Sequence, residues 1–164
     1  MRGNPEIPSM ALQQAVARHR MGRLAEACEF YRQALLENPG QGEVHYNLAN
    51  ALNALGRMED AKAAYQKAVA LLPGLAKAHY NLANLHRAQG SAKAALASYR
   101  DAIRAKPNFA EAHNNMGTLL LTQGDAEAAI MSYRQALVAR QGYAVAYNNL
   151  GYAYFLKKDY TAAI

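Results

Sequence analysis

The sequence predicts an all-α protein, built as a solenoid of stacked helical hairpins. Several types of residue recur every 34 positions along the 164-residue chain, a period typical of helix-turn-helix repeats. The chain is also rich in alanine and poor in β-branched residues, a composition that favours helix in nearly every segment. Five series keep the spacing: Gly22, Gly56, Gly90 and Gly124; Ala27, Ala61, Ala95, Ala129 and Ala163; Tyr31, Tyr65, Tyr99 and Tyr133; Ala34, Ala68, Ala102 and Ala136; and Pro39, Pro73 and Pro107.

The period divides the chain into consecutive units. Residues 1–8 contain two prolines and a glycine, and we expect them to form a flexible leader. Residues 9–164 are expected to form a single array. The units of this array are residues 8–41, 42–75, 76–109, 110–143 and 144–164, of which the last is incomplete.

The second unit shows how each hairpin is specified. Leu48, Leu52 and Leu55 recur at steps of three and four residues and predict an amphipathic helix. Gly56 ends this helix, because the chain must enter a left-handed conformation that glycine adopts without strain. A second apolar stripe follows and stops before Pro73, which cannot continue a helix. Neither helix can bury its stripe alone, so the two must pack antiparallel.

Small residues at facing positions predict close packing within a hairpin. Ala83 falls late in the first helix of the third unit and Ala95 falls early in the second helix. Side chains of this size let two helices approach to about 8 Å.

These residues form the pattern of the tetratricopeptide repeat, a family that the chain resembles over almost its whole length. The second unit supplies the pattern through His45, Leu48, Ala49, Leu52, Gly56, Ala61, Tyr65, Ala68 and Pro73. The third and fourth units repeat it, with Gln141 in place of the fourth unit's proline. The resemblance implies a right-handed superhelix in which the first helix of each unit lines a concave groove.

Both ends of the array depart from the pattern. The first unit has Gln14 and Arg18 at two large apolar positions, as suits the exposed end of a stack. The fifth unit has Lys158 at the glycine position, so we expect a differently shaped bend. The chain stops at Ile164 without a polar capping helix, leaving Tyr147 and its neighbours covered on one side. We therefore expect either a fragment of a longer array or a face that meets another molecule.

Residues that could carry catalysis or bind a metal are not arranged to do so. His45, His79 and His113 lie on successive units about 10 Å apart, whereas ligands of one zinc ion each lie about 2 Å from it. We expect these histidines to pack between helices, and Cys28 to be a small packing residue. The sequence contains no phosphate loop and no nucleophile motif. It therefore predicts a protein that is not an enzyme and has no cofactor or metal.

The charge distribution argues against nucleic acid as a partner. The net charge is +6, but the basic residues are dispersed, and many stand late in second helices, where cations complement the helix dipole. No run of about 18 apolar residues is present, so we expect no membrane span. The single cysteine is compatible with a reducing compartment, and we expect a cytoplasmic location.

A column of asparagines is the strongest functional signal. Asn47, Asn81, Asn115 and Asn149 recur at 34 residues on the first helices, and a second series follows one turn later. A side-chain amide both donates and accepts, so it can pair with the C=O and N–H of a peptide bond. A regular ladder of amides could hold an extended chain by its backbone. The alternative is that each asparagine bonds a neighbouring helix.

The ladder resembles the superhelical repeat arm of O-GlcNAc transferases, which grips substrate peptides in this way. By this resemblance we expect a non-catalytic interaction module that binds an extended peptide or partner protein in its concave groove. The residues expected to line the groove are Tyr46, Asn47, Asn50, Lys77, Tyr80, Asn81, Asn84, Arg87, Asn115 and Asn149, with Asn53, Glu111, Asn114, Thr118, Asn148 and Tyr152 at equivalent positions.

Two alternative functions belong to other classes. The chain could be the substrate-recognition arm of a larger glycosyltransferase whose catalytic domain lies beyond Ile164. It could also be a self-assembling scaffold that associates through its uncapped C-terminal face or takes up a neighbour's helix in the groove.

Overall fold

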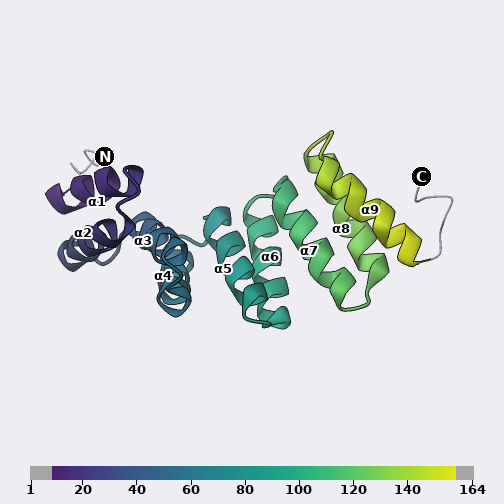
Figure 1. Ribbon diagram of the computed structural model, residues 1–164, viewed down its shortest axis with the longest axis horizontal. Coiled ribbons are helices and arrows are strands. Elements are labelled where there is room, and N and C mark those ends of the chain that lie inside the picture. The colour runs from purple at the N-terminus through teal and green to yellow at the C-terminus, as the bar shows by residue number, and fades with distance from the viewer. Residues whose placement is uncertain (1–8, 158–164) are drawn as a thin grey trace, which may run out of the picture. The chain divides into compact units, whose positions relative to one another are not determined.

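A computed structural model describes residues 9–157, and every regular element among these residues is an α-helix (Figure 1). The helices are α1 (Met10–Arg20), α2 (Leu24–Glu37), α3 (Gly42–Ala54), α4 (Met58–Leu71), α5 (Ala76–Ala88), α6 (Ala92–Ala105), α7 (Ala110–Thr122), α8 (Ala126–Ala139) and α9 (Ala144–Leu156). The predicted all-α fold is therefore confirmed. The predicted leader, Lys158 and the second helix of the fifth unit lie outside the described residues.

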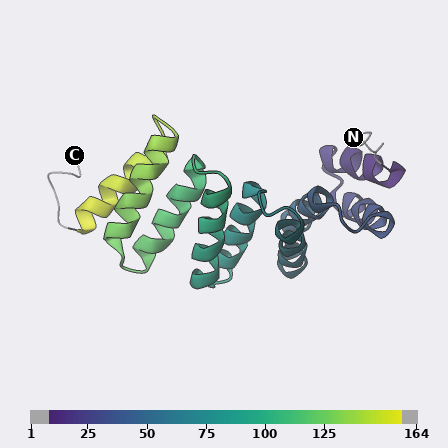
Figure 2. The same cartoon turned by 180° about the vertical axis from the view of Figure 1, so that it is seen from behind.

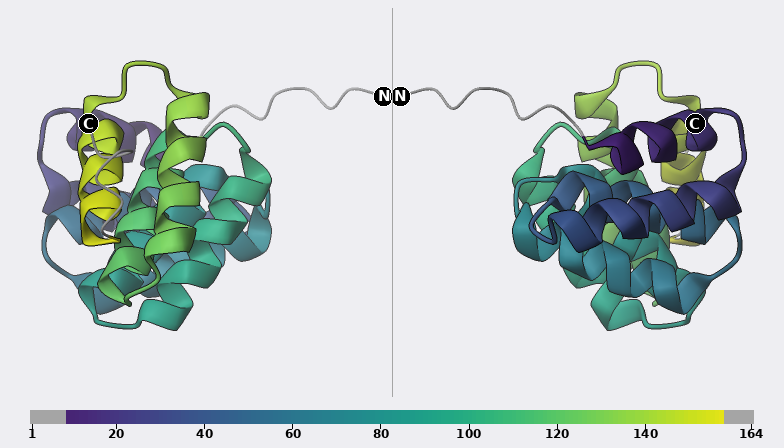
Figure 3. Two further views of the ribbon diagram at one scale, coloured as in Figure 1. Left: turned by 90° about the vertical axis from the view of Figure 1, so that its right-hand side faces the viewer. Right: turned by 90° about the vertical axis from the view of Figure 1, so that its left-hand side faces the viewer.

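The helices form two compact units, one ending at Pro73 and the other beginning at Gly74. In the first unit α1 packs on α2 and α3 packs on α4, and α2 also contacts α3. In the second unit the hairpins are α5 with α6 and α7 with α8, and these can be followed from both sides in Figures 1 and 2. Figure 3 shows α9 (yellow) lying along α8 (green), its main neighbour.

Glycine ends the first helix of each hairpin. Gly56 has a φ of 74°, in the left-handed region that costs other residues about 1–2 kcal/mol. Nothing lies within 4 Å of the position that a Cβ would take there, so the backbone conformation, and not lack of space, requires glycine. The N–H of Arg57 returns to the carbonyl of Leu52 at 2.9 Å, which closes the end of α3.

A buried tyrosine closes each hairpin from within. Tyr31, Tyr65, Tyr99 and Tyr133 are the largest fully buried side chains of the described core. The Tyr65 hydroxyl donates to Oδ1 of Asn50, and the Tyr99 hydroxyl donates to Oδ1 of Asn84, both at 2.6 Å. Because a buried hydroxyl without a partner costs free energy, these asparagines have a structural role inside the hairpin.

Histidines at the start of two hairpins form hydrogen bonds to the loop that precedes each hairpin. His45 Nε2 donates to the carbonyl of Pro39 at 3.1 Å, and His113 Nε2 donates to that of Pro107 at 2.9 Å. This contact agrees with a packing role for the histidines. Within the described part of the chain, no three His, Cys, Asp or Glu residues gather where they could hold a metal ion. No helix among residues 9–157 has the length and apolar character needed to cross a membrane.

Candidate functional site

The asparagines of the ladder lie on the first helix of each hairpin, and we call the side of α3 that carries Asn47 the ladder face of the first unit, and the corresponding side of α5, α7 and α9 the ladder face of the second unit. The surroundings of the ladder differ between the two compact units. In the second unit the amides form a connected network, whereas in the first unit the ladder amide borders a pocket.

In the second unit the ladder amide of Asn115 is occupied by contacts within the protein. Its Nδ2 donates to the Tyr80 hydroxyl at 2.9 Å and to Oδ1 of Asn84 at 3.2 Å. Oδ1 of Asn84 also accepts the hydroxyl of Tyr99, whose pKa is raised to about 12 by burial. Both hydrogens of the Asn115 amide therefore hold α7 against α5.

The network continues to α9. Asn114, which is 4% exposed, donates from Nδ2 to Oδ1 of Asn115 at 3.3 Å. Nδ2 of Asn149 in turn donates to Oδ1 of Asn114 at 3.0 Å. These asparagines bond neighbouring helices, so in this unit the ladder joins one hairpin to the next.

In the first unit the equivalent amide has no such partners. Tyr80 and Asn84 precede Asn115 by 35 and 31 residues, and the same offsets from Asn47 lead to Leu12 and Val16, which are apolar. The side-chain amide of Asn47 accordingly makes no hydrogen bond to any residue that the structure describes. Its donors and its acceptor remain available to a ligand.

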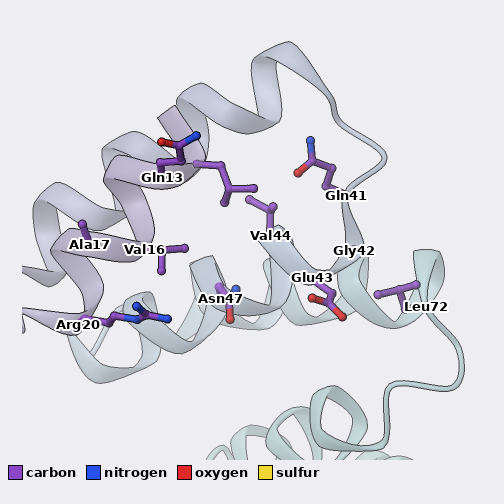
Figure 4. A pocket seen from close by; sticks show the side chains of 11 residues that line it. Gln13, Val16, Ala17, Arg20, Gln41, Gly42, Glu43, Val44, Asn47 and Leu72 are labelled. Carbon is purple, nitrogen blue, oxygen red and sulfur yellow. The ribbon is translucent and has the colours of Figure 1, made fainter. Parts of the chain in front are cut away.

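Asn47 borders a pocket of about 720 Å³ between α1 and α3 (Figure 4). The lining residues are Leu12, Gln13, Val16, Ala17, Arg20, Gln41, Gly42, Glu43, Val44, Asn47 and Leu72. Gly42 shapes one end, because a Cβ at this position would lie 2.6 Å from Cγ of Leu72. The repeat pattern did not predict the pocket, although the available signal was that Leu12 and Val16 stand where the next unit has Tyr46 and Asn50.

The two charged residues of the pocket have opposite signs. Arg20 and Glu43 are both exposed and stand toward opposite ends of the pocket, with Asn47 between them (Figure 4). Neither forms an ion pair with another described residue. The pocket thus combines apolar residues with the side-chain amides of Gln13, Gln41 and Asn47 and with two charges that have no ion pair among the described residues.

The other predicted site residues divide into packed and exposed groups. Tyr46 packs on Tyr65 with ring centroids 6.1 Å apart, and Tyr80 packs on Phe109 with ring centroids 4.9 Å apart. These rings therefore belong partly to the core. The predicted residues Asn50, Asn81 and Asn84 are half-buried, whereas Lys77 and Arg87 are exposed.

Glu111, which was expected to line the groove, is paired within the second unit. Its carboxylate accepts a hydrogen bond from the Arg140 guanidinium. Burial acts to raise the pKa of Glu111, but the hydrogen bond and charge of Arg140 outweigh it, and the pKa lies below its ordinary value. The carboxylate is therefore partly neutralised as a contact for a ligand.

Models of the tetratricopeptide repeat match residues 18–70 and 114–164, and a TPR repeat model matches residues 83–124. The chain belongs to the tetratricopeptide repeat family. Proteins of this family are interaction modules and are typically non-catalytic, so this tetratricopeptide repeat protein is a protein-interaction module. No curated protein sequence matches the chain.

Solved structures share the fold of this tetratricopeptide repeat protein. A crystal structure of MamA is 24% identical and has a TM-score of 0.86 over 91% of this chain and 87% of its own. YrrB, described as a TPR protein with an unusual peptide-binding site, is 22% identical with a TM-score of 0.82 over 98% and 83% of the two chains. MamA from Desulfovibrio magneticus RS-1 is 20% identical with a TM-score of 0.83 over 96% and 91%.

Proposed function

We propose that this protein binds an extended segment of a partner protein on the ladder face of its first unit, without catalysing a reaction. The observation that carries the proposal is the unoccupied amide of Asn47 beside the pocket between α1 and α3. The corresponding amide of Asn115 is consumed inside the protein, so the first unit is the better candidate for backbone recognition.

The geometry suits an extended chain. The amide of Asn47 can donate to one peptide carbonyl and accept from one peptide N–H. Successive side chains of an extended segment point to opposite sides, so one side chain can enter the pocket while the next points to solvent. Burial of that side chain against apolar residues supplies affinity, and the amide fixes the position of the backbone.

Two further observations support a peptide ligand. The pocket is built from two helices that are held by the buried tyrosines of their hairpins, so little ordering of the protein accompanies binding. YrrB, which shares the fold, is described as having a peptide-binding site. The exposed Lys77 and Arg87 offer separate polar contacts on the second unit.

Asn47→Ala is expected to weaken binding of a partner segment by about 5- to 150-fold, because it removes two hydrogen bonds of about 0.5–1.5 kcal/mol each. The melting temperature should change little, since the Asn47 side chain bonds no described residue. Isothermal titration calorimetry with a segment mapped from a partner captured from lysate measures the affinity, and circular dichroism measures melting.

Asn115→Ala is the matched control, because it is the same substitution at the same repeat position. It breaks three hydrogen bonds within the second unit and should lower the melting temperature while leaving affinity at the first unit intact. Unchanged affinity of Asn47→Ala, or an equal loss of affinity in both variants, would contradict the proposed site.

Self-association through the C-terminal face is a second candidate, supported by the apolar side chains that α9 exposes. Tyr147, which was expected to be covered on one side only, is 55% exposed. If this surface joins two copies, light scattering should show a mass that rises with concentration, and Tyr147→Ser should return the protein to a monomer. A monomer at every concentration would count against this candidate.

A further inference from the structure

The walls of the pocket between α1 and α3 are apolar on both helices. Leu12 and Val16 come from α1, and Val44 comes from α3 and is 3% exposed. Leu72, which follows α4, lines one end. A charged or amide side chain packed against these four residues would lose hydration, whereas an apolar side chain would gain by burial. The pocket therefore favours a large aliphatic or aromatic side chain.

Arg20 is the one arginine in the described α1 region that keeps its charge available to a ligand. Its neighbours Arg18 and Arg23 both pair with Glu26, at 3.0 and 2.6 Å. Arg20 has no carboxylate partner among the described residues, and it lines the pocket with its side chain exposed. An anionic group at this end of a bound segment would be attracted, and a cationic group would be repelled.

At the other end of the pocket, Glu43 favours a cationic group of the bound segment and disfavours an anionic one. It stands in the first turn of α3, is exposed, and has no cationic partner in the described part of the chain. Figure 4 shows Glu43 toward the Leu72 end and Arg20 at the other, with Asn47 between them. The pocket is therefore positive at the Arg20 end and negative at the Glu43 end, and a bound segment would have to carry the opposite charges in the same order.

We infer that the pocket selects an internal segment of a partner protein in which a large apolar residue is flanked by an acidic residue beside Arg20 and a basic residue beside Glu43. This inference rests on the proposed function, which it makes more specific. Arg20 is the single cation among the described lining residues, and one guanidinium matches one side-chain carboxylate. Figure 4 shows Asn47 between Arg20 and Glu43, so its amide can bond the backbone of a segment that places its flanking charges beside these two residues.

A random peptide library displayed within fixed flanking residues tests the inference even when the natural partner is unidentified. Selection on the wild-type protein should enrich peptides with an apolar residue between an acidic and a basic one. Selection on Arg20→Glu should replace the acidic flank with a basic one. A synthetic peptide with the wild-type motif should bind Arg20→Glu about 10-fold more weakly, as expected for reversal of one partly exposed charge.

Arg100→Glu is the matched control. Arg100 is also an exposed arginine on a helix without a described carboxylate partner, but it belongs to the second unit and does not line the pocket. It should select the wild-type motif with unchanged affinity. Circular dichroism should show that both variants remain folded, because neither arginine has an ion pair to lose. Arg20→Glu should melt slightly lower than the wild type, because it places an anion in the last turn of α1.

The results that would contradict the charge selection differ from those that would contradict peptide binding itself. Enrichment of an apolar residue without charged flanks, on wild type and Arg20→Glu alike, would overturn the charge selection and leave peptide binding in place. A synthetic peptide that ends at the acidic residue and binds more tightly than the same motif inside a longer peptide would overturn the assignment to an internal segment. No enrichment on the wild-type protein would overturn peptide binding itself.

Discussion

Replacing Tyr99 with alanine is expected to lower the free energy of unfolding by about 3–5 kcal/mol, the usual cost of removing a large aromatic ring from a core. The ring is fully buried and packs with Ala83, Ala95 and Ala102 in the core of the second unit. These three alanines are too short to fill the space that the ring leaves. Urea unfolding followed by far-ultraviolet circular dichroism measures the loss.

Tyr99→Phe distinguishes the contribution of the ring to stability from that of its hydroxyl. This variant keeps the packing but removes the hydrogen bond to Asn84, whose Oδ1 still accepts from Asn115. The expected loss is about 1 kcal/mol. If Tyr99→Phe were as destabilising as Tyr99→Ala, the hydroxyl network and not the packed ring would be the main source of stability.

The second large effect is expected for Ala95→Leu, which should destabilise the protein by about 1–3 kcal/mol through overpacking. Ala95 is 0% exposed and lies in the same core cluster as Ala83 and Tyr99, where α6 meets α5. A leucine side chain can fit there only if the helices separate or Tyr99 leaves its position.

Ala97→Leu provides the comparison on the same helix. Ala97 is exposed on α6, and leucine has nearly the helix propensity of alanine, so its melting midpoint should stay close to that of the wild type. An unchanged midpoint for Ala95→Leu as well would show that the two helices are not held at the close distance that small residues allow.

The fold could be predicted from the sequence because each recurring residue has a local physical cause. Gly56 was expected to end the first helix of the second unit by a left-handed turn, and it does so with a φ of 74° after α3 ends at Ala54. Pro73 was expected to stop the second helix, and α4 ends at Leu71. These effects depend on nearby residues, which the sequence displays directly.

The candidate site was less predictable, because identical residues at identical repeat positions have different partners. Asn47 and Asn115 are equivalent in the 34-residue pattern, yet one is available and the other is committed to Tyr80 and Asn84. The difference comes from residues more than 30 positions earlier, and its significance depends on how the side chains meet. The pocket itself required the side-chain geometry around Leu72, which no spacing rule supplies.

The tyrosine that closes each hairpin also has a consequence for folding kinetics. Tyr65 and Asn50, and likewise Tyr99 and Asn84, are separated by only 15 residues along the chain. The entropy lost in closing so short a loop is small, and chains rich in local contacts reach their native topology quickly. Each hairpin can therefore assemble around its own tyrosine before it meets its neighbour, so that nucleation can begin at several places along the chain and spread by docking.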